Sequence, residues 1–329
     1  MTHRKDREIP TLFEVRRAHR RIAPYLHVTP LHNYPSLDRL VGAEIHVKHE
    51  NHQPTGAFKV RGGINLISQL TEEEAGHGVI AASTGNHGQS IAYASRLFGV
   101  HAVICVPEGA NEAKVGSIKD LGAEIVVHGK DYDDAREHCE ALAEERGYRY
   151  IHSGNESQLI AGVGTATLEL LEEQPHLAAI IVPVGGGSGA AGTCIAAKSI
   201  RAKSTEPDIE VIGVQSEGAP AAYRSWKQKE LVEDRIDTFA EGLQTRTAFE
   251  LPQRILWALL DDFVLVSDDA IKEAMRLMIE HTRNLVEGAG AAPLAAALAL
   301  RDRLQGRRVA IICSGGNVTP AQLRSIMCE

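Results

Sequence analysis

The sequence has few aromatic residues, no excess of positive charge and no long apolar run. Aromatic residues make up 5% of the 329 residues, and the formal net charge is −8. Both values argue against a nucleic-acid binder, because such proteins need basic patches and use stacking rings. No apolar run reaches the roughly 18 residues that a membrane helix needs. We therefore expect neither a nucleic-acid partner nor a membrane-spanning segment.

Cysteine is also sparse, and the sequence starts without a secretory leader. The five cysteines stand apart and form no CxxC pair, a pattern typical of free thiols in a reducing compartment. The first ten residues, MTHRKDREIP, are polar and lack the apolar segment of a signal peptide. These features predict a cytoplasmic protein.

Short apolar segments alternate with amphipathic stretches almost throughout the chain. The apolar segments predict buried strands at 43–47, 79–82, 102–106, 124–127, 179–184, 210–214, 262–266 and 309–313. Helix signals stand between them: Gly147 ends the stretch 131–146, and Ser267 precedes 268–283. The polar stretch 225–247 predicts long connections. This alternation is typical of α/β proteins with parallel sheets between helix layers, and the length allows about two domains.

The first unusual passage is Asn51–Gly63, with the sequence NHQPTGAFKVRGG. Pro54 and Gly56 predict a turn, which places Lys59 at the start of a helix. A lysine is poorly placed for stability at the positive end of a helix. The same position lowers the pKa of the amine, which suits a lysine that forms a Schiff base. A solvated surface lysine is the alternative.

Two turns between a strand and a helix are rich in small residues. Ser83–Gln89 reads STGNHGQ after strand 79–82, and Gly185–Gly189 reads GGGSG after strand 179–184. The free backbone N–H groups of such turns and the helix dipole form anion sites. An ordinary capped helix is the alternative at the first turn.

The second turn is open to another interpretation. Residues 187–192 match the G-x-G-x-x-G pattern of dinucleotide-binding proteins, with Glu210 or Glu217 as possible ribose partners. A single match of this kind is a weak signal. A nicotinamide-dependent dehydrogenase therefore remains an alternative from another functional class.

Taken together, these motifs resemble those of the fold-type II pyridoxal phosphate enzymes, in the branch of threonine dehydratase and serine racemase. Residues 54–62 match the P-T-G-S-F-K-x-R-G pattern except at Ala57, and residues 83–87 match S-[SA]-G-N-H except at Thr84. The similarity extends from about Thr11 to Asn317. It implies an α/β fold like that of the tryptophan synthase β subunit, with two three-layer α/β/α domains of mostly parallel sheets. It also implies a large domain formed by 1–77 and 153–329, and a small domain, 78–152, inserted in it.

The resemblance also implies roles for individual residues. Pyridoxal 5'-phosphate would be held by Phe58, Lys59, Asn86, Gly185, Gly186, Gly187, Ser188, Gly189, Gly242 and Ser314. The substrate carboxylate would lie at Ser83, Thr84, Gly85, Asn86 and His87. The expected catalytic residues are Lys59 and Thr84. Besides Ala57, two positions depart from the family pattern: Ser188 replaces the usual glycine, and Thr84 stands where racemases have serine and many dehydratases have alanine.

Two further positions bear on the type of reaction. Ser314 resembles the family serine at the pyridine nitrogen, which makes the ring a weaker electron sink and favours β-elimination. Related enzymes hold a cation with two acidic residues where this chain has Gln215 and Ala221. A hard cation prefers carboxylate ligands, so we expect no metal site of that kind.

The expected activity is the dehydration and deamination of a 3-hydroxy amino acid, such as L-threonine or L-serine, to a 2-oxo acid and ammonia. The expected partners are this amino-acid substrate and a second copy of the chain in a homodimer. Serine racemase and 3-hydroxyaspartate dehydratase are the alternatives within the enzyme class. A non-catalytic amino-acid sensor is an alternative outside that class. Few residues follow Ser314, so we expect no C-terminal regulatory domain and no feedback inhibition.

Overall fold

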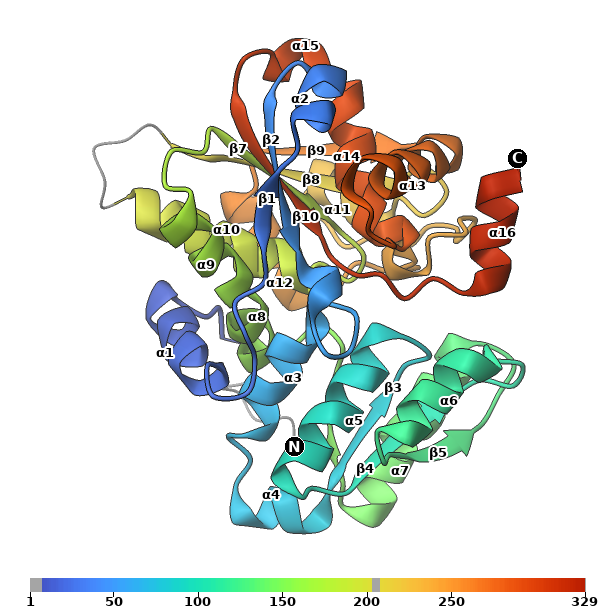
Figure 1. The fold of residues 1–329 in the computed structure, drawn as a ribbon. Coiled ribbons are helices and arrows are strands. Elements are labelled where there is room, and N and C mark those ends of the chain that lie inside the picture. The colour runs from blue at the N-terminus through green and yellow to red at the C-terminus, as the bar shows by residue number, and fades with distance from the viewer. Residues whose placement is uncertain (1–7, 203–207, 329) are drawn as a thin grey trace.

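The chain forms two separate β-sheets, each lying between layers of helices (Figure 1). This computed structural model describes residues 8–202 and 208–328. Within them, the larger sheet has six strands in the order β1-β2-β10-β7-β8-β9, and the smaller has four in the order β5-β4-β3-β6. The strands are β1 (Leu31–Asn33), β2 (Glu44–His49), β3 (Val79–Ala82), β4 (Ala102–Val106), β5 (Glu124–Val127), β6 (Arg149–Tyr150), β7 (Ala179–Pro183), β8 (Glu210–Ser216), β9 (Asp262–Val266) and β10 (Arg308–Cys313). Their pairings within the sheets are parallel except that of β1 with β2.

Helices precede or follow most strands, as the alternating pattern predicts. They are α1 (Leu12–Ile22), α2 (Pro35–Val41), α3 (Lys59–Ile67), α4 (Glu72–His77), α5 (Asn86–Phe98), α6 (Glu112–Asp120), α7 (Tyr132–Arg146), α8 (Ser157–Val163), α9 (Thr165–Glu173), α10 (Ser188–Arg201), α11 (Ala221–Gln228), α12 (Glu250–Leu259), α13 (Asp268–Thr282), α14 (Gly288–Ala299), α15 (Arg301–Leu304) and α16 (Pro320–Cys328). Two short 3-10 helices are η2 (Glu50–His52) and η3 (Glu241–Leu243). Within 8–202 and 208–328, none of the helices has the length and apolar character needed to cross a membrane.

The six-stranded sheet is buried on both faces. Ile181 and Val309 point into an apolar cluster shared with α13 and α14. Their chain neighbours Ile180 and Ala310 point the other way, into a cluster shared with α10 and α12. Successive residues of a strand face opposite sides, so near-continuous apolar strands are what this three-layer arrangement requires. The predicted α/β class with mostly parallel sheets is confirmed.

The four-stranded sheet is also covered on both faces. One apolar cluster joins β3 and β4 to α3 and α5, and the other joins them to α7. The sheet itself lies within residues 79–150. Helix α3 packs on it although α3 comes earlier in the chain. The predicted domain boundaries at 78 and 152 stay a prediction.

Glycines let α3 approach its neighbours closely. A Cβ atom added to Gly63 would lie 2.3 Å from Oγ of Ser90 in α5. One added to Gly162 of α8 would lie 2.6 Å from the carbonyl oxygen of Arg61. Side chains at these positions would push the helices apart, because such contacts are far below van der Waals distance. Helix α3 is therefore held tightly between α5 and α8.

The structure differs from the sequence prediction mainly where elements are short or polar. Strands β1 and β6 were not predicted, because they have three and two residues and show no apolar run. Helix α5 begins at Asn86, so the second half of the turn predicted at 83–89 is helical. Helix α11 takes the first residues of the stretch 225–247, and most of the remainder is irregular, as predicted.

Candidate active site

Lys59 is the first residue of α3, and its amine reaches two other segments of the chain. Nζ donates hydrogen bonds to the carbonyl oxygen of Ser153 at 3.0 Å and to Oγ of Ser188 at 2.8 Å. It also lies 5.4 Å from the centre of the Phe58 ring. Burial lowers the pKa of Lys59 to about 8. The fraction of neutral amine at neutral pH is therefore raised, as a nucleophilic lysine requires.

The segment before Lys59 lies against the segment that follows β10. The backbone N–H of Phe58 donates to the carbonyl oxygen of Ser314 at 2.9 Å, and Ala57 forms an isolated bridge with Gly315. These contacts arise because β2 and β10 are adjacent and parallel, so their C-terminal ends meet at one edge of the sheet. Ser314 is thereby placed beside Phe58 and Lys59.

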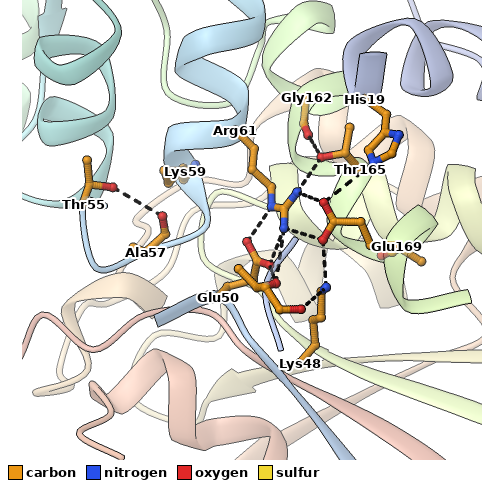
Figure 2. A network of polar contacts seen from close by, with 12 residues as sticks. His19, Lys48, Glu50, Thr55, Ala57, Lys59, Arg61, Gly162, Thr165 and Glu169 are labelled. Carbon is orange, nitrogen blue, oxygen red and sulfur yellow. Dashed lines mark hydrogen bonds and ion pairs between the residues drawn. The ribbon is translucent and has the colours of Figure 1, made fainter. Parts of the chain in front are cut away.

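Two residues after Lys59, Arg61 lies in a buried network of charged side chains (Figure 2). Its guanidinium binds both carboxylate oxygens of Glu50 at 2.7 and 2.8 Å, and both of Glu169 at 2.6 and 2.7 Å. Lys48 Nζ also donates to Glu169 at 2.8 Å. Burial opposes the charge of Glu50, but Arg61 holds the pKa of this carboxyl below its usual value. Two positive and two negative groups balance, and they fix the start of α3 relative to β2, η2 and α9.

The turn after β3 carries the residues expected to bind a substrate carboxylate. Gly85 is the N-cap of α5, so the free N–H groups of the first helical turn lie beside it. The hydroxyl of Ser83 accepts a hydrogen bond from the N–H of Gly85 at 3.2 Å. A Cβ atom on Gly85 would meet no atom within 4 Å, so the turn is open at this point. Thr84 is half-buried there.

His87 lies beneath this turn and faces Lys59. Burial, followed by the charge of Lys59, lowers the pKa of His87 to about 3, so its ring is neutral at physiological pH. Nε2 lies 3.4 Å from the carbonyl oxygen of Ile151. The other nitrogen, Nδ1, is buried without a hydrogen-bond partner among the residues that the structure describes. A buried ring nitrogen of this kind has a capacity for one more polar contact.

Asn86 joins the small sheet to the segment after β10. Its Nδ2 donates to Oε1 of Glu287 at 2.8 Å, and its Oδ1 accepts from Nδ2 of Asn317 at 2.7 Å. Nδ2 of Asn317 also donates to the carbonyl oxygen of Thr55 at 2.9 Å. Burial raises the pKa of Glu287. Three predicted motifs, the lysine segment, the turn after β3 and the segment after β10, therefore meet at one place.

The glycine loop joins β7 to α10 and passes close to several other segments. Gly187 has a φ of +86° and turns the chain into α10 at Ser188, a conformation that favours glycine. A Cβ atom on Gly185 would lie 2.2 Å from the carbonyl oxygen of Gly242, and one on Gly189 would lie 3.1 Å from the Phe58 ring. The loop thus brings Gly242, Phe58 and the amine of Lys59 together.

Replacing Gly185 by alanine is expected to lower the free energy of unfolding by about 1–3 kcal/mol, because the new methyl group would overlap a backbone oxygen. Urea unfolding would measure the loss. Gly116→Ala is the matched control, because a Cβ atom there meets no atom within 4 Å and alanine favours the interior of α6 by up to about 1 kcal/mol. Equal stability of the Gly185 variant and the parent protein would contradict the packing described here.

The sheet register excludes Glu210, one of the two ribose partners of the dinucleotide interpretation of residues 187–192. Glu210 pairs with Ala179 at the start of β7, whereas the glycine loop follows the other end of that strand. Glu210 also binds Arg307 at 2.9 Å. It therefore lies at the wrong edge of the sheet to contact a ribose bound at the loop.

Several contacts at the site were not predicted from the sequence. Ser153 binds Lys59 through its backbone, which no side-chain pattern reveals. A Cβ atom on Gly186 would lie 2.3 Å from the ring of Phe249, a residue that belongs to no motif.

Gln215 and Ala221 stand at the two positions where related enzymes hold a cation with acidic residues. Gln215 is buried in β8, and its Oε1 accepts from the N–H of Tyr223 at 3.0 Å. Ala221 is the first residue of α11. No group of three or more His, Cys, Asp or Glu side chains within 8–202 and 208–328 is arranged to hold a metal ion. The lack of a metal site stays a prediction.

The fold and the site define a class: an α/β protein of two sheets, with a half-buried lysine between two helix N-termini. The chain belongs to the family described as pyridoxal-phosphate dependent enzymes, whose model matches residues 22–315. It is 37% identical to an L-threonine ammonia-lyase of Thermotoga maritima over 94% of this chain and 76% of that one. It is 38% identical to a serine racemase of Dictyostelium discoideum over 96% and 98% of the two chains. The structure of maize serine racemase superimposes with a TM-score of 0.90, at 34% identity and 98% coverage of each chain.

The residues present fit pyridoxal phosphate. Lys59 supplies an amine of lowered pKa for the aldehyde carbon. The glycine loop and the N-terminus of α10 supply backbone N–H groups for a phosphate. The unpartnered Nδ1 of His87 offers a further polar contact nearby. The chain is thus an enzyme that uses this cofactor. The predicted membership of the pyridoxal phosphate family is confirmed.

Proposed function

We propose that the chain is an ammonia-lyase that converts a 3-hydroxy amino acid, such as L-threonine or L-serine, to a 2-oxo acid and ammonia. The observation that carries the proposal is the amine of Lys59, of lowered pKa, between the glycine loop and the turn after β3. The similarity to an L-threonine ammonia-lyase supports it.

Each residue of the site has a role in this proposal. Pyridoxal phosphate supplies an electron sink that makes the α-proton of a bound amino acid acidic. Lys59 holds the cofactor and, once released, takes that proton. The turn 83–87 binds the substrate carboxylate through N–H groups at the start of α5. The remaining cofactor contacts are those at Phe58, Asn86, Gly185–Gly189, Gly242 and Ser314.

A second candidate is an amino-acid racemase, which is favoured by the similarity to two serine racemases. Racemisation needs a second base on the opposite face of the substrate from Lys59. The hydroxyl of Thr84 on the turn after β3 is the candidate for it. The homodimer stays a prediction.

A panel of 3-hydroxy amino acids separates the candidates. The purified protein with its cofactor is incubated with L-threonine, L-serine and 3-hydroxyaspartate, and the release of 2-oxo acid is followed. We expect steady release from at least one of them. Chiral analysis of serine then measures D-serine, and D-serine without release of 2-oxo acid from any member of the panel would replace the lyase proposal by the racemase. Absence of both products would contradict both candidates.

A further inference from the structure

Ser188 is the side chain in the glycine loop that reaches the amine of Lys59. It is the first residue of α10 and only 2% exposed. Its Oγ lies 2.8 Å from Nζ of Lys59. The left-handed backbone of Gly187 directly before it turns the chain into α10. A glycine at this position would give Lys59 no side-chain partner in the loop.

In the described ranges, two oxygen atoms accept hydrogen bonds from the amine of Lys59, and the Ser188 hydroxyl is the one that belongs to a side chain. The second oxygen bound to Nζ, that of Ser153, belongs to the backbone of the segment after β6. Phe58 offers only the face of its ring, at 5.4 Å. The titratable group that faces Lys59 is His87, which is neutral because burial and Lys59 itself hold its pKa near 3. The oxygens of Ser188 and Ser153 thus carry the polar contacts of the amine in the described part of the chain.

We propose that Ser188 is a positioning residue: its hydroxyl, with the carbonyl of Ser153, holds the free amine of Lys59 where that amine acts as the base. This inference rests on the proposed function, in which Lys59 is released from the cofactor while the substrate is bound. An ammonium group has three N–H donors. When the group loses one proton to become the base, its two remaining N–H donors are directed to Ser153 and Ser188, so the lone pair remains on the substrate side to accept the α-proton.

The hydroxyl also has an electrostatic effect on Lys59. A hydrogen bond to a charged donor stabilises the charged form. Loss of the hydroxyl therefore destabilises the ammonium form relative to the amine, and the pKa of Lys59 falls. The expected decrease is about one. A residue that only fills space in the loop would not change this pKa.

The test follows the attachment of pyridoxal phosphate to Lys59 in the full-length protein after the cofactor has been removed. Attachment needs the neutral amine, so the pH midpoint of its rate reports the pKa of Lys59. We expect the midpoint of Ser188→Ala to lie about one pH unit below that of the parent protein. Ser90→Ala is the matched control, because the Ser90 hydroxyl is equally buried but donates to the backbone carbonyl of Lys59 at 2.7 Å. Its midpoint should equal that of the parent.

Steady-state kinetics of the reloaded enzyme give a second readout. We expect Ser188→Ala to lower kcat about tenfold with little change in KM, because the base is less well placed and the substrate contacts remain. Ser188→Gly is the second variant in case alanine disturbs the loop. An unchanged midpoint in a folded variant of either kind would overturn the proposal.

The attachment experiment also separates this proposal from the proposed function. The midpoint is measured without any substrate, so it stands even if no 2-oxo acid is released from the panel. A shifted midpoint with no lyase activity would support the role of Ser188 and contradict the lyase. A parent protein that attaches no cofactor at Lys59 would overturn both.

Discussion

Replacing Lys59 by alanine is expected to lower the rate of 2-oxo acid release by at least about a thousandfold, because the variant lacks the base for the α-proton. It also lacks the amine that attaches the cofactor, so borohydride treatment followed by mass spectrometry should find no cofactor bound at position 59. Both measurements use the purified full-length protein after incubation with pyridoxal phosphate.

The control for this experiment is a lysine that the structure places elsewhere. Lys198 lies on α10 and pairs with Asp208 and Asp261 at 3.0 and 2.7 Å. Lys198→Ala should retain the activity and the borohydride-trapped cofactor of the parent protein. Near-parental turnover by the Lys59 variant would remove Lys59 from the reaction and with it the proposed mechanism.

Replacing Arg61 by methionine is expected to lower the free energy of unfolding by about 3–5 kcal/mol, because Glu50 and Glu169 would stay buried with too little positive charge. Activity should fall as well, since Arg61 fixes the helix that begins at Lys59. Urea unfolding and the rate of 2-oxo acid release measure the two effects. Because Arg61 keeps the pKa of Glu50 below its unfolded value, this stabilisation is present at neutral pH and is lost as the pH falls through the lowered pKa.

Arg307→Met is the matched control for this second experiment. Arg307 also binds a carboxylate, that of Glu210 at 2.9 Å, but its side chain is 29% exposed. Its loss should cost no more than about 1 kcal/mol, as is usual for pairs near the surface. If the two variants lost similar amounts of unfolding free energy, burial of the Arg61 network would not be the cause of its contribution to stability.

Much of the fold could be predicted from local sequence. Strands that are buried on both faces are nearly continuous apolar runs, so β3 and β4 agree with the prediction residue by residue. The less buried strands β5 and β9 also agree, because their short apolar runs mark them. Helix starts were also accessible where a side chain caps them. Ser267, for example, accepts a hydrogen bond from the N–H of Ala270 at 3.2 Å.

The contacts that complete the site could not be predicted, because they join residues that are distant in the chain. Lys48 lies in an apolar strand and finds its partner Glu169 on α9, 121 residues later. No local pattern marks such a pair. The glycine loop shows the same limit. Its motif indicated a phosphate site, but the contacts of Gly185 with Gly242 and of Gly186 with Phe249 are made by segments more than 50 positions later in the chain, which no local pattern predicts.

The pairing of β2 with β10 has a consequence for how the protein folds during synthesis. Glu44 lies opposite Arg308, which is 264 residues later in the chain. At about 5–20 residues per second, a ribosome needs roughly ten seconds to a minute to make that stretch. One edge of β2 is covered early by its neighbour β1, while the other edge stays uncovered until β10 is made. The lysine segment can therefore reach its final place, and bind the cofactor, only after β10 has been made.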